Sequence, residues 1–143
     1  MTGRMIHTFV PGTPVPQGSV DVYRGRVVSV KAPLKKWRDS IRKATLERHE
    51  GEPLDGPLTV ALAFQLAPPQ RPRWPLPAVK PDLDKLIRSV LDSLSTVKHK
   101  GAVIAPGVIA DDARIVHITA AKAYHGTPGV MITITQTGET THA

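Results

Sequence analysis

Two pairs of closely spaced aspartates stand out in a chain that is basic as a whole. Asp82 and Asp84 lie one residue apart in the segment KPDLDKLIRSVLDSL, and Asp111 and Asp112 are adjacent in ADDARI. Hard divalent cations such as Mg²⁺ bind clustered carboxylate oxygens and fill their remaining positions with water. If the fold brings the two pairs together, these four aspartates are candidate ligands for a divalent cation.

Each pair also has a structural explanation. Asp82 follows Pro81 and precedes an apolar stripe, which is typical of a helix N-cap, and Asp84 would add favourable charge in the first helical turn. Asp111 and Asp112 could cap a turn at the start of a strand. The sequence leaves the capping and the metal-binding interpretations open.

Arg88 lies one helical turn after Asp84, and Asp92 lies one turn after Arg88. The three residues could therefore form a surface ladder of ion pairs. Alternatively, Arg88 could balance the negative charge that builds up on a phosphate during cleavage, and Lys80 and Lys85 could do the same. Both interpretations fit the spacing.

The composition limits the classes of chemistry. Nineteen Lys and Arg residues against twelve Asp and Glu residues give a formal net charge of +7, and there is no cysteine. Disulfides, thiolate metal sites and cysteine nucleophiles are thus excluded, and the six histidines lack metalloprotease spacing. A positive charge favours a nucleic-acid partner, although a basic protein without one is the alternative. Carboxylate-held metals in such a protein suit phosphodiester hydrolysis.

Hydrophobic periodicity predicts a single two-layer α+β domain over residues 1–143, with a small mixed or antiparallel sheet of four to five strands and two main helices. The strands are expected at residues 6–10, 20–30 (a hairpin turning at Arg24-Gly25), 58–66, 111–125 and 130–134, and the helices at 34–49 and 83–94. Val116, Ile118 and Ala120 are expected on a core face. Residues 95–110 read as a loop with weak strand character around Val108 and Ile109, and 136–143 as a frayed tail.

Basic residues gather in three predicted elements. The helix at 34–49 carries Lys35 and Lys36 on a face that is either solvated or lies against phosphates. The hairpin carries Arg24 and Arg26, and the proline-rich loop that follows residue 66 carries Arg71 and Arg73 beside Trp74. That loop could grip nucleic acid by stacking and charge, or Trp74 could instead pack the loop onto the core.

The order of these motifs resembles one known family. The chain resembles the RusA-type Holliday-junction resolvases of phages and bacteria in the order of its motifs. That order is GTPVPQGS, a hairpin, a basic helix, a proline loop, KPDLDKLIRSVLDSL, IADDARI and AAKAYHGTPGVMITI. The resemblance implies a homodimeric, Mg²⁺-dependent endonuclease that binds four-way DNA junctions and nicks two opposed strands symmetrically. Mn²⁺ is a plausible substitute for Mg²⁺.

The resemblance also implies roles for individual residues. Asp82 and Asp84 match the acids at the helix start, Asp111 and Asp112 match the second acidic pair with Asp112 as its essential member, and Arg88 stands where the family usually has lysine. Lys85 replaces a common asparagine, and the loop at 97–108 is longer than usual. Lys122 matches a lysine that we expect to contact a phosphate, unless it is a solvated lysine at a strand edge.

The chain shows no membrane segment, because its longest apolar runs fall far short of the roughly 20 residues needed to span a bilayer. Residues 1–10 also lack the apolar segment of a signal peptide. We therefore expect a soluble, DNA-associated protein of the bacterial cytoplasm without an organic cofactor. A non-catalytic DNA-binding protein is the main alternative, and a nucleotide-sugar enzyme with a D-x-D metal site is a weaker one.

Overall fold

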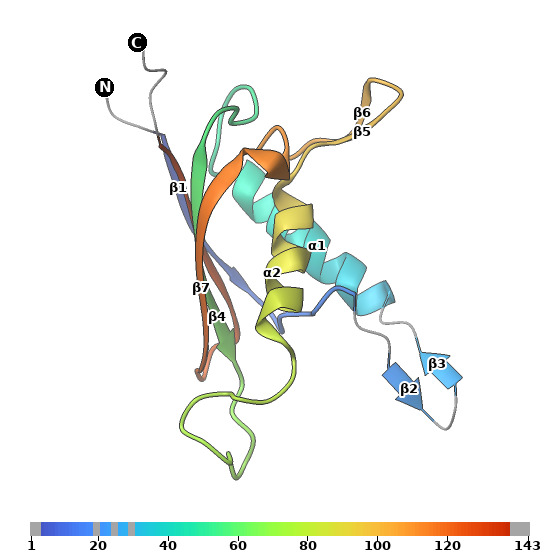
Figure 1. The fold of residues 1–143 in the computed structure, drawn as a ribbon, viewed down its shortest axis with the longest axis vertical. Helices are drawn as coiled ribbons and strands as arrows, with labels where there is room; N and C mark the ends of the chain where they lie inside the picture. The colour runs from blue at the N-terminus through green and yellow to red at the C-terminus, as the bar shows by residue number, and fades with distance from the viewer. Residues whose placement is uncertain (1–3, 19–20, 24–25, 29–30, 138–143) are drawn as a thin grey trace.

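The computed structural model describes residues 4–18, 21–23, 26–28 and 31–137 (Figure 1). A four-stranded mixed sheet packs against two helices, which confirms the predicted α+β class. The elements in chain order are β1 (Met5–Pro11), β2 (Asp21–Tyr23), β3 (Arg26–Val28), α1 (Lys31–Leu46), β4 (Leu58–Leu66), α2 (Leu83–Leu94), β5 (Val97–His99), β6 (Ala102–Ala105), the 3₁₀ turn η1 (Asp112–Arg114), β7 (Ile115–Tyr124) and β8 (Gly129–Gln136).

The sheet has the strand order β1-β8-β4-β7. β4 runs parallel to β7 and antiparallel to β8, so the chain must cross over between β4 and β7, and α2 lies in that crossover. Both helices cover the same face of the sheet (Figure 1). β4 alternates as its sequence predicts, with Val60, Leu62 and Phe64 buried toward the helices.

The core between the layers is built from the apolar stripes that the sequence shows. α1 contributes Trp37 and Ile41, and α2 contributes Leu86, Val90 and Leu94, all buried against the sheet. Burying one such side chain contributes about 1.5 to 3 kcal/mol relative to leaving it in water. The stripe on α2 therefore fixes which of its faces points outward, and that outer face carries the acidic and basic residues considered below.

Strand β7 forms one edge of the sheet and departs from the expected burial. Val116 is 68% exposed because the β4–β7 register shifts between Leu58 and Thr59, so Val116 is an extra residue opposite that step. The prediction that Val116 lies on the core face is therefore wrong. Ile118 pairs with Val60 but is still 37% exposed, whereas Ala120 packs against the core.

The other boundaries differ less. α1 begins at Lys31 and ends at Leu46, three residues earlier at each end than the apolar spacing predicts. The strands of the 20–30 hairpin form as β2 and β3, while its turn, Arg24-Gly25, lies outside the described residues. Residues 97–105, expected to be loop, form a second hairpin of β5 and β6.

Candidate active site

Asp82 occupies the N-cap position of α2, as its place before the apolar stripe predicts. Its backbone is extended, with φ −67° and ψ 137°, but its side chain makes no capping hydrogen bond. The carboxylate is half exposed, and its Oδ2 lies 3.8 Å from Nζ of Lys85. Asp84, in the first turn, is exposed as well. Capping therefore does not occupy the Asp82 carboxylate, which is left available to a ligand.

The backbone before Asp82 is held by Lys122, which reaches over from β7. Its Nζ donates hydrogen bonds to the carbonyl oxygens of Val79 at 2.6 Å and Pro81 at 2.8 Å. Lys122 lies on the helix-facing side of the sheet because it pairs with the buried Phe64. Its ammonium group thus supports the segment that presents Asp82, a role that neither sequence interpretation of Lys122 included.

The second acid pair lies at the start of η1, directly before β7. Asp111 is the N-cap of this turn, and its Oδ1 accepts a hydrogen bond from the backbone N–H of Ala113 at 2.9 Å. Arg114 donates from Nε to Asp55 Oδ1, which ties the turn to the segment before β4. The capping interpretation therefore holds for Asp111, while Asp112 has no such role.

The two adjacent carboxyl groups of η1 interact directly. The pKa of Asp112 is raised, first by a hydrogen bond with Asp111, then by partial burial and by the charges of Asp111 and Asp92. The pKa of Asp111 is lowered, chiefly by the N–H of Ala113. Two carboxyl groups in contact need a shared proton or a bound cation to offset their repulsion. This pair therefore suits a cation.

Asp92 joins this region from the C-terminal half of α2. Its Oδ2 accepts a hydrogen bond from Nε2 of Gln17, and its negative charge contributes to the raised pKa of Asp112. The backbone N–H of Gln17 also donates to the carbonyl of Lys85 at 3.0 Å. Sequence reasoning did not assign Asp92 or Gln17 to the site. Asp92 lies on the same helical face as Asp84 and Arg88, one turn after Arg88. That spacing is the feature of the sequence that could have indicated Asp92 as a site residue.

The ladder of ion pairs along α2, one of the two interpretations that the spacing left open, does not form among the described residues. Within the described residues, Arg88 makes no salt bridge with Asp84 or Asp92. Its guanidinium instead lies beside the loop before β2, since a Cβ placed on Gly18 would be 3.9 Å from Nη1 of Arg88. Among the described residues, no carboxylate neutralises the Arg88 guanidinium.

The two acid pairs remain separate along α2. Asp92 is eight positions after Asp84, which at the helical rise of 1.5 Å is about 12 Å along the axis. Asp112 lies near the Asp92 end, because the charge of Asp92 acts on it. In the part of the chain that the structure describes, no three acidic or histidine side chains come together as a possible metal site. Exposed carboxylates still suit a hard cation, so the donor chemistry fits at each pair, with water or a phosphate completing the ligands.

Comparison with known proteins places these residues in a family. The family model of endodeoxyribonuclease RusA matches residues 11–135. The chain belongs to the RusA endodeoxyribonuclease family. A search of curated proteins found no match. RusA endodeoxyribonucleases resolve Holliday junctions, and the matched range includes both acid pairs, Arg88 and Lys122. The resemblance inferred from the motifs is confirmed.

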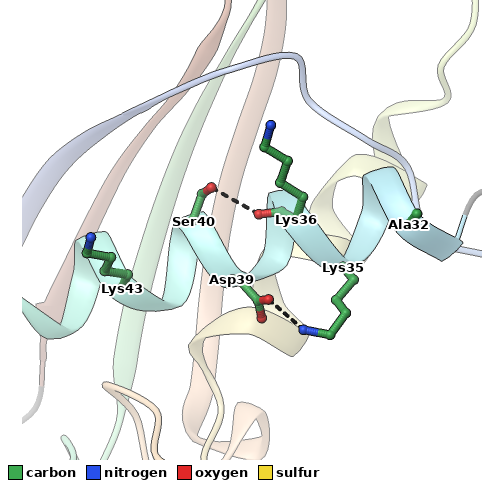
Figure 2. A pocket seen from close by; sticks show the side chains of 6 residues that line it. All are labelled: Ala32, Lys35, Lys36, Asp39, Ser40 and Lys43. Carbon is green, nitrogen blue, oxygen red and sulfur yellow. Dashed lines mark hydrogen bonds and ion pairs between the residues drawn. The ribbon is translucent and has the colours of Figure 1, made fainter.

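Helix α1 presents several lysines to solvent on its outer side. Figure 2 shows Lys36 and Lys43 extending from one side of the helix and Lys35 and Asp39 meeting on the other. Nζ of Lys35 lies 2.7 Å from Asp39 Oδ2, so its charge is partly neutralised, whereas Lys36 and Lys43 make no salt bridge with any described residue. Lys43, which was not among the predicted DNA contacts, therefore extends the charged surface.

The proline-rich loop that leads to Asp82 carries further exposed positive charge. Arg71, Arg73 and Lys80 are exposed, and the guanidinium of Arg73 stacks over Trp74 with 4.2 Å to the ring centroid. Trp74 is 40% exposed, so packing onto the core is not its role. Of the hairpin arginines, Arg26 has only its backbone described, in β3, and Arg24 lies outside the described residues.

The described helices do not include one that is both long and apolar enough to cross a membrane.

Proposed function

We propose that this chain resolves four-way DNA junctions by paired, symmetric nicks that depend on divalent cations held by its aspartates. The observation that carries the proposal is the Asp82 carboxylate. It stands at a helix N-cap without making a capping hydrogen bond, within the family-matched region and beside exposed cations. Among the described residues its one ion pair is the long, half-exposed contact with Lys85 at 3.8 Å, which leaves the carboxylate oxygens accessible to a ligand.

Asp82 and Asp84 would hold one cation, and Asp111 and Asp112 would hold a second cation at η1. Because the two pairs are separate, one cation would serve each reacting phosphate: Mg²⁺ at Asp82 and Asp84, when bound, would activate water for attack on the phosphodiester. Mn²⁺ accepts the same oxygen ligands and is expected to substitute. The Lys122 contacts to Val79 and Pro81 support this arrangement by fixing the backbone that presents Asp82.

The surrounding cations would bind the DNA and counter the charge of the reacting phosphate. Arg88 and Lys85 lie on α2 within one or two turns of the acids at its start, where they can donate to a phosphate oxygen. Arginine offers a planar fork and lysine a point charge, so Arg88 is expected to orient the phosphate as well as neutralise it. Five other cations would bind phosphates of the DNA backbone farther from the reacting one. They are Lys35, Lys36, Arg71, Arg73 and Lys80.

Two symmetric nicks require two active sites in matching orientations. A homodimer supplies them by its two-fold axis, and we therefore include a second copy of the chain as a partner. Branched DNA is the proposed substrate. The expected location is the cytoplasm of a bacterial host cell, where the protein would associate with DNA. Four-way junctions have approximate two-fold symmetry of their own, which fits this arrangement.

A junction-cleavage assay tests the proposal. A synthetic four-way junction with each strand labelled in turn is incubated with the protein in Mg²⁺ or in EDTA, beside a linear duplex of the same sequence. We expect paired nicks in opposed strands only with Mg²⁺, sparing of the duplex, and no product from Asp82→Asn, which should still bind the junction. Equal cutting of both DNAs would remove the claim of structure selectivity. Binding without Mg²⁺-dependent product would favour the non-catalytic alternative.

A further inference from the structure

The β5–β6 hairpin, residues 97–105, forms an arm that leaves the body of the protein (Figure 1). Its tip is Lys100-Gly101, with φ of 50° and 80°, and two successive positive φ angles are what a type I′ turn requires. All of the residues from 97 to 104 are exposed. The arm therefore makes little contribution to the core and is presented to solvent.

The root of the arm is held firmly by both helices. Arg42 of α1 donates from Nη1 to the carbonyl oxygens of Ser95 and Pro106, each at 2.8 Å. Thr96 Oγ1 donates to the carbonyl of Ile109 at 2.9 Å. A Cβ on Gly107 would lie 2.4 Å from the backbone of Leu94, so this close crossing needs glycine. The arm therefore projects in a set direction from the end of α2.

The arm exposes apolar side chains that a free hairpin would be expected to replace by polar ones. Val97 is 37% exposed, Val103 is 55% and Ile104 is 63%. They are three of nine large exposed apolar residues in the described part of the chain, although the arm has only nine residues. A short two-stranded hairpin cannot bury them itself, so a partner is needed to cover them.

Charge identifies the class of that partner. Lys98, His99 and Lys100 surround the tip, and no acidic residue occurs between residues 93 and 110. At the root, a groove of about 380 Å³ separates the arm from α1. Its lining includes Arg38 and Arg42 beside Val97, together with the ion pair of Lys35 and Asp39, so its net charge is positive. The arm thus combines an apolar surface with cations at its tip and a net positive charge at its root. A polyanion with apolar faces, such as DNA with unstacked bases, matches both features.

We propose that the arm contacts DNA at the branch point of the junction. Lys98 and Lys100 pair with phosphates, and Val103 and Ile104 pack against bases or sugars that the branch leaves exposed. This assignment rests on the proposed junction-resolving function and adds a contact to it. Apolar side chains inserted beside base steps are a known way to hold distorted DNA, at the cost of some stacking.

Two double variants and two matched controls test the arm. V103S/I104S removes its apolar surface, and K98Q/K100Q removes its tip charge, in both cases at exposed positions. M5S and R4Q are the controls, since Met5 is 65% exposed and Arg4, just before β1, is exposed as well. Each protein is first compared with the wild type by thermal unfolding and by sedimentation, which report folding and oligomeric state.

Binding is then measured in EDTA, so that chemistry does not enter. A junction with 2-aminopurine beside the branch point and a linear duplex are the probes. V103S/I104S should weaken junction binding by about tenfold, leave duplex binding unchanged and abolish the rise in 2-aminopurine fluorescence. K98Q/K100Q should weaken binding to both DNAs and reduce the slope of log affinity against log salt by roughly two. The controls should match the wild type.

The possible results distinguish a failure of the arm assignment from a failure of the proposed function. Junction cleavage by the wild type, together with arm variants that bind like the wild type, would overturn the arm assignment alone. A changed oligomeric state in V103S/I104S with unaltered DNA binding would make the arm a contact between copies and would also overturn it. A wild type that neither cleaves nor prefers junctions would overturn the proposed function, and the arm assignment with it.

Discussion

Lys122 on β7 donates a hydrogen bond from Nζ to the backbone carbonyl of Pro81, 2.8 Å away, and so joins the edge of the sheet to the residue before Asp82. A second bond runs to the carbonyl of Val79 at 2.6 Å. Charged donors form stronger hydrogen bonds than neutral ones. The position of the acidic helix start is thus determined partly by a lysine about forty residues later in the chain.

Replacing Lys122 by methionine should therefore affect the arrangement of the site more than DNA affinity. We expect the free energy of unfolding to fall by about 1 to 2 kcal/mol and junction cleavage to slow, with junction affinity reduced little. Urea unfolding, single-turnover cleavage and binding in EDTA measure the three quantities. Lys43→Met, which removes an exposed charge from α1, is the control and should weaken binding without loss of stability. The reverse pattern would make Lys122 a phosphate contact instead.

The missing cap of Asp82 leads to an unusual combination of effects. Asp82→Ala should change the free energy of unfolding by less than about 0.5 kcal/mol, because no capping hydrogen bond is lost, whereas a working cap contributes about 1 kcal/mol. Junction cleavage should nevertheless be abolished. Asp111→Ala is the matched comparison, since it loses the bond from Ala113 and should lower the melting temperature. A clear loss of stability in Asp82→Ala would show that the side chain does cap α2.

Local pattern predicted the scaffold of the site well. The alternation of β4 and the apolar stripe of α2 predicted both elements, and with them the outward face that carries Asp84, Arg88 and Asp92. The spacing of Leu86 and Val90 on that stripe left only one face for the polar residues. The position of Asp82 at the helix start followed from the same periodicity, because the cap precedes the first apolar turn.

Contacts between distant segments could not be predicted in this way. Gln17 reaches Asp92 across 75 residues, and neither side chain carries a local signal of the other. The shift of register at Thr59 that exposes Val116 depends on how β4 and β7 pair, which a single strand does not reveal. The β5–β6 arm was missed because its turn uses Lys100 at positive φ, where asparagine or glycine is the usual signal.

The carboxyl pair on η1 should make the metal-free protein sensitive to pH. Because the folded state raises the pKa of Asp112, its stabilising contribution is complete below the ordinary aspartate pKa, about 3.9, and is lost as pH rises through the raised value. Asp112→Asn mimics the protonated form. In EDTA, we therefore expect it to melt at a higher temperature than the wild type at pH 7, with the difference disappearing near pH 3.

Calorimetry across that pH range tests whether Asp112→Asn melts above or below the wild type. Added Mg²⁺ tests whether repulsion between the two carboxylates causes the difference. A cation bound at the pair should raise the melting temperature of the wild type at pH 7 by more than that of Asp112→Asn, which keeps only the Asp82–Asp84 site. Equal responses of both proteins to Mg²⁺ would mean that no cation binds at η1. A variant that melts below the wild type at pH 7 would mean that the ionised pair is not repulsive in the folded state.

Arg42 connects the end of α2 to the arm and should contribute mostly to stability. Its guanidinium donates to the carbonyls of Ser95 and Pro106, and to that of Asp92 at 3.1 Å. Arg42→Met should lower the free energy of unfolding by about 2 to 3 kcal/mol, because three acceptors lose a charged donor. Arg38→Met, one turn earlier on α1, should change it by less than about 0.5 kcal/mol and should instead weaken DNA binding at low salt. Urea unfolding and salt-dependent binding distinguish the two. Similar losses of stability in both variants would show that the carbonyl contacts do not hold the root of the arm.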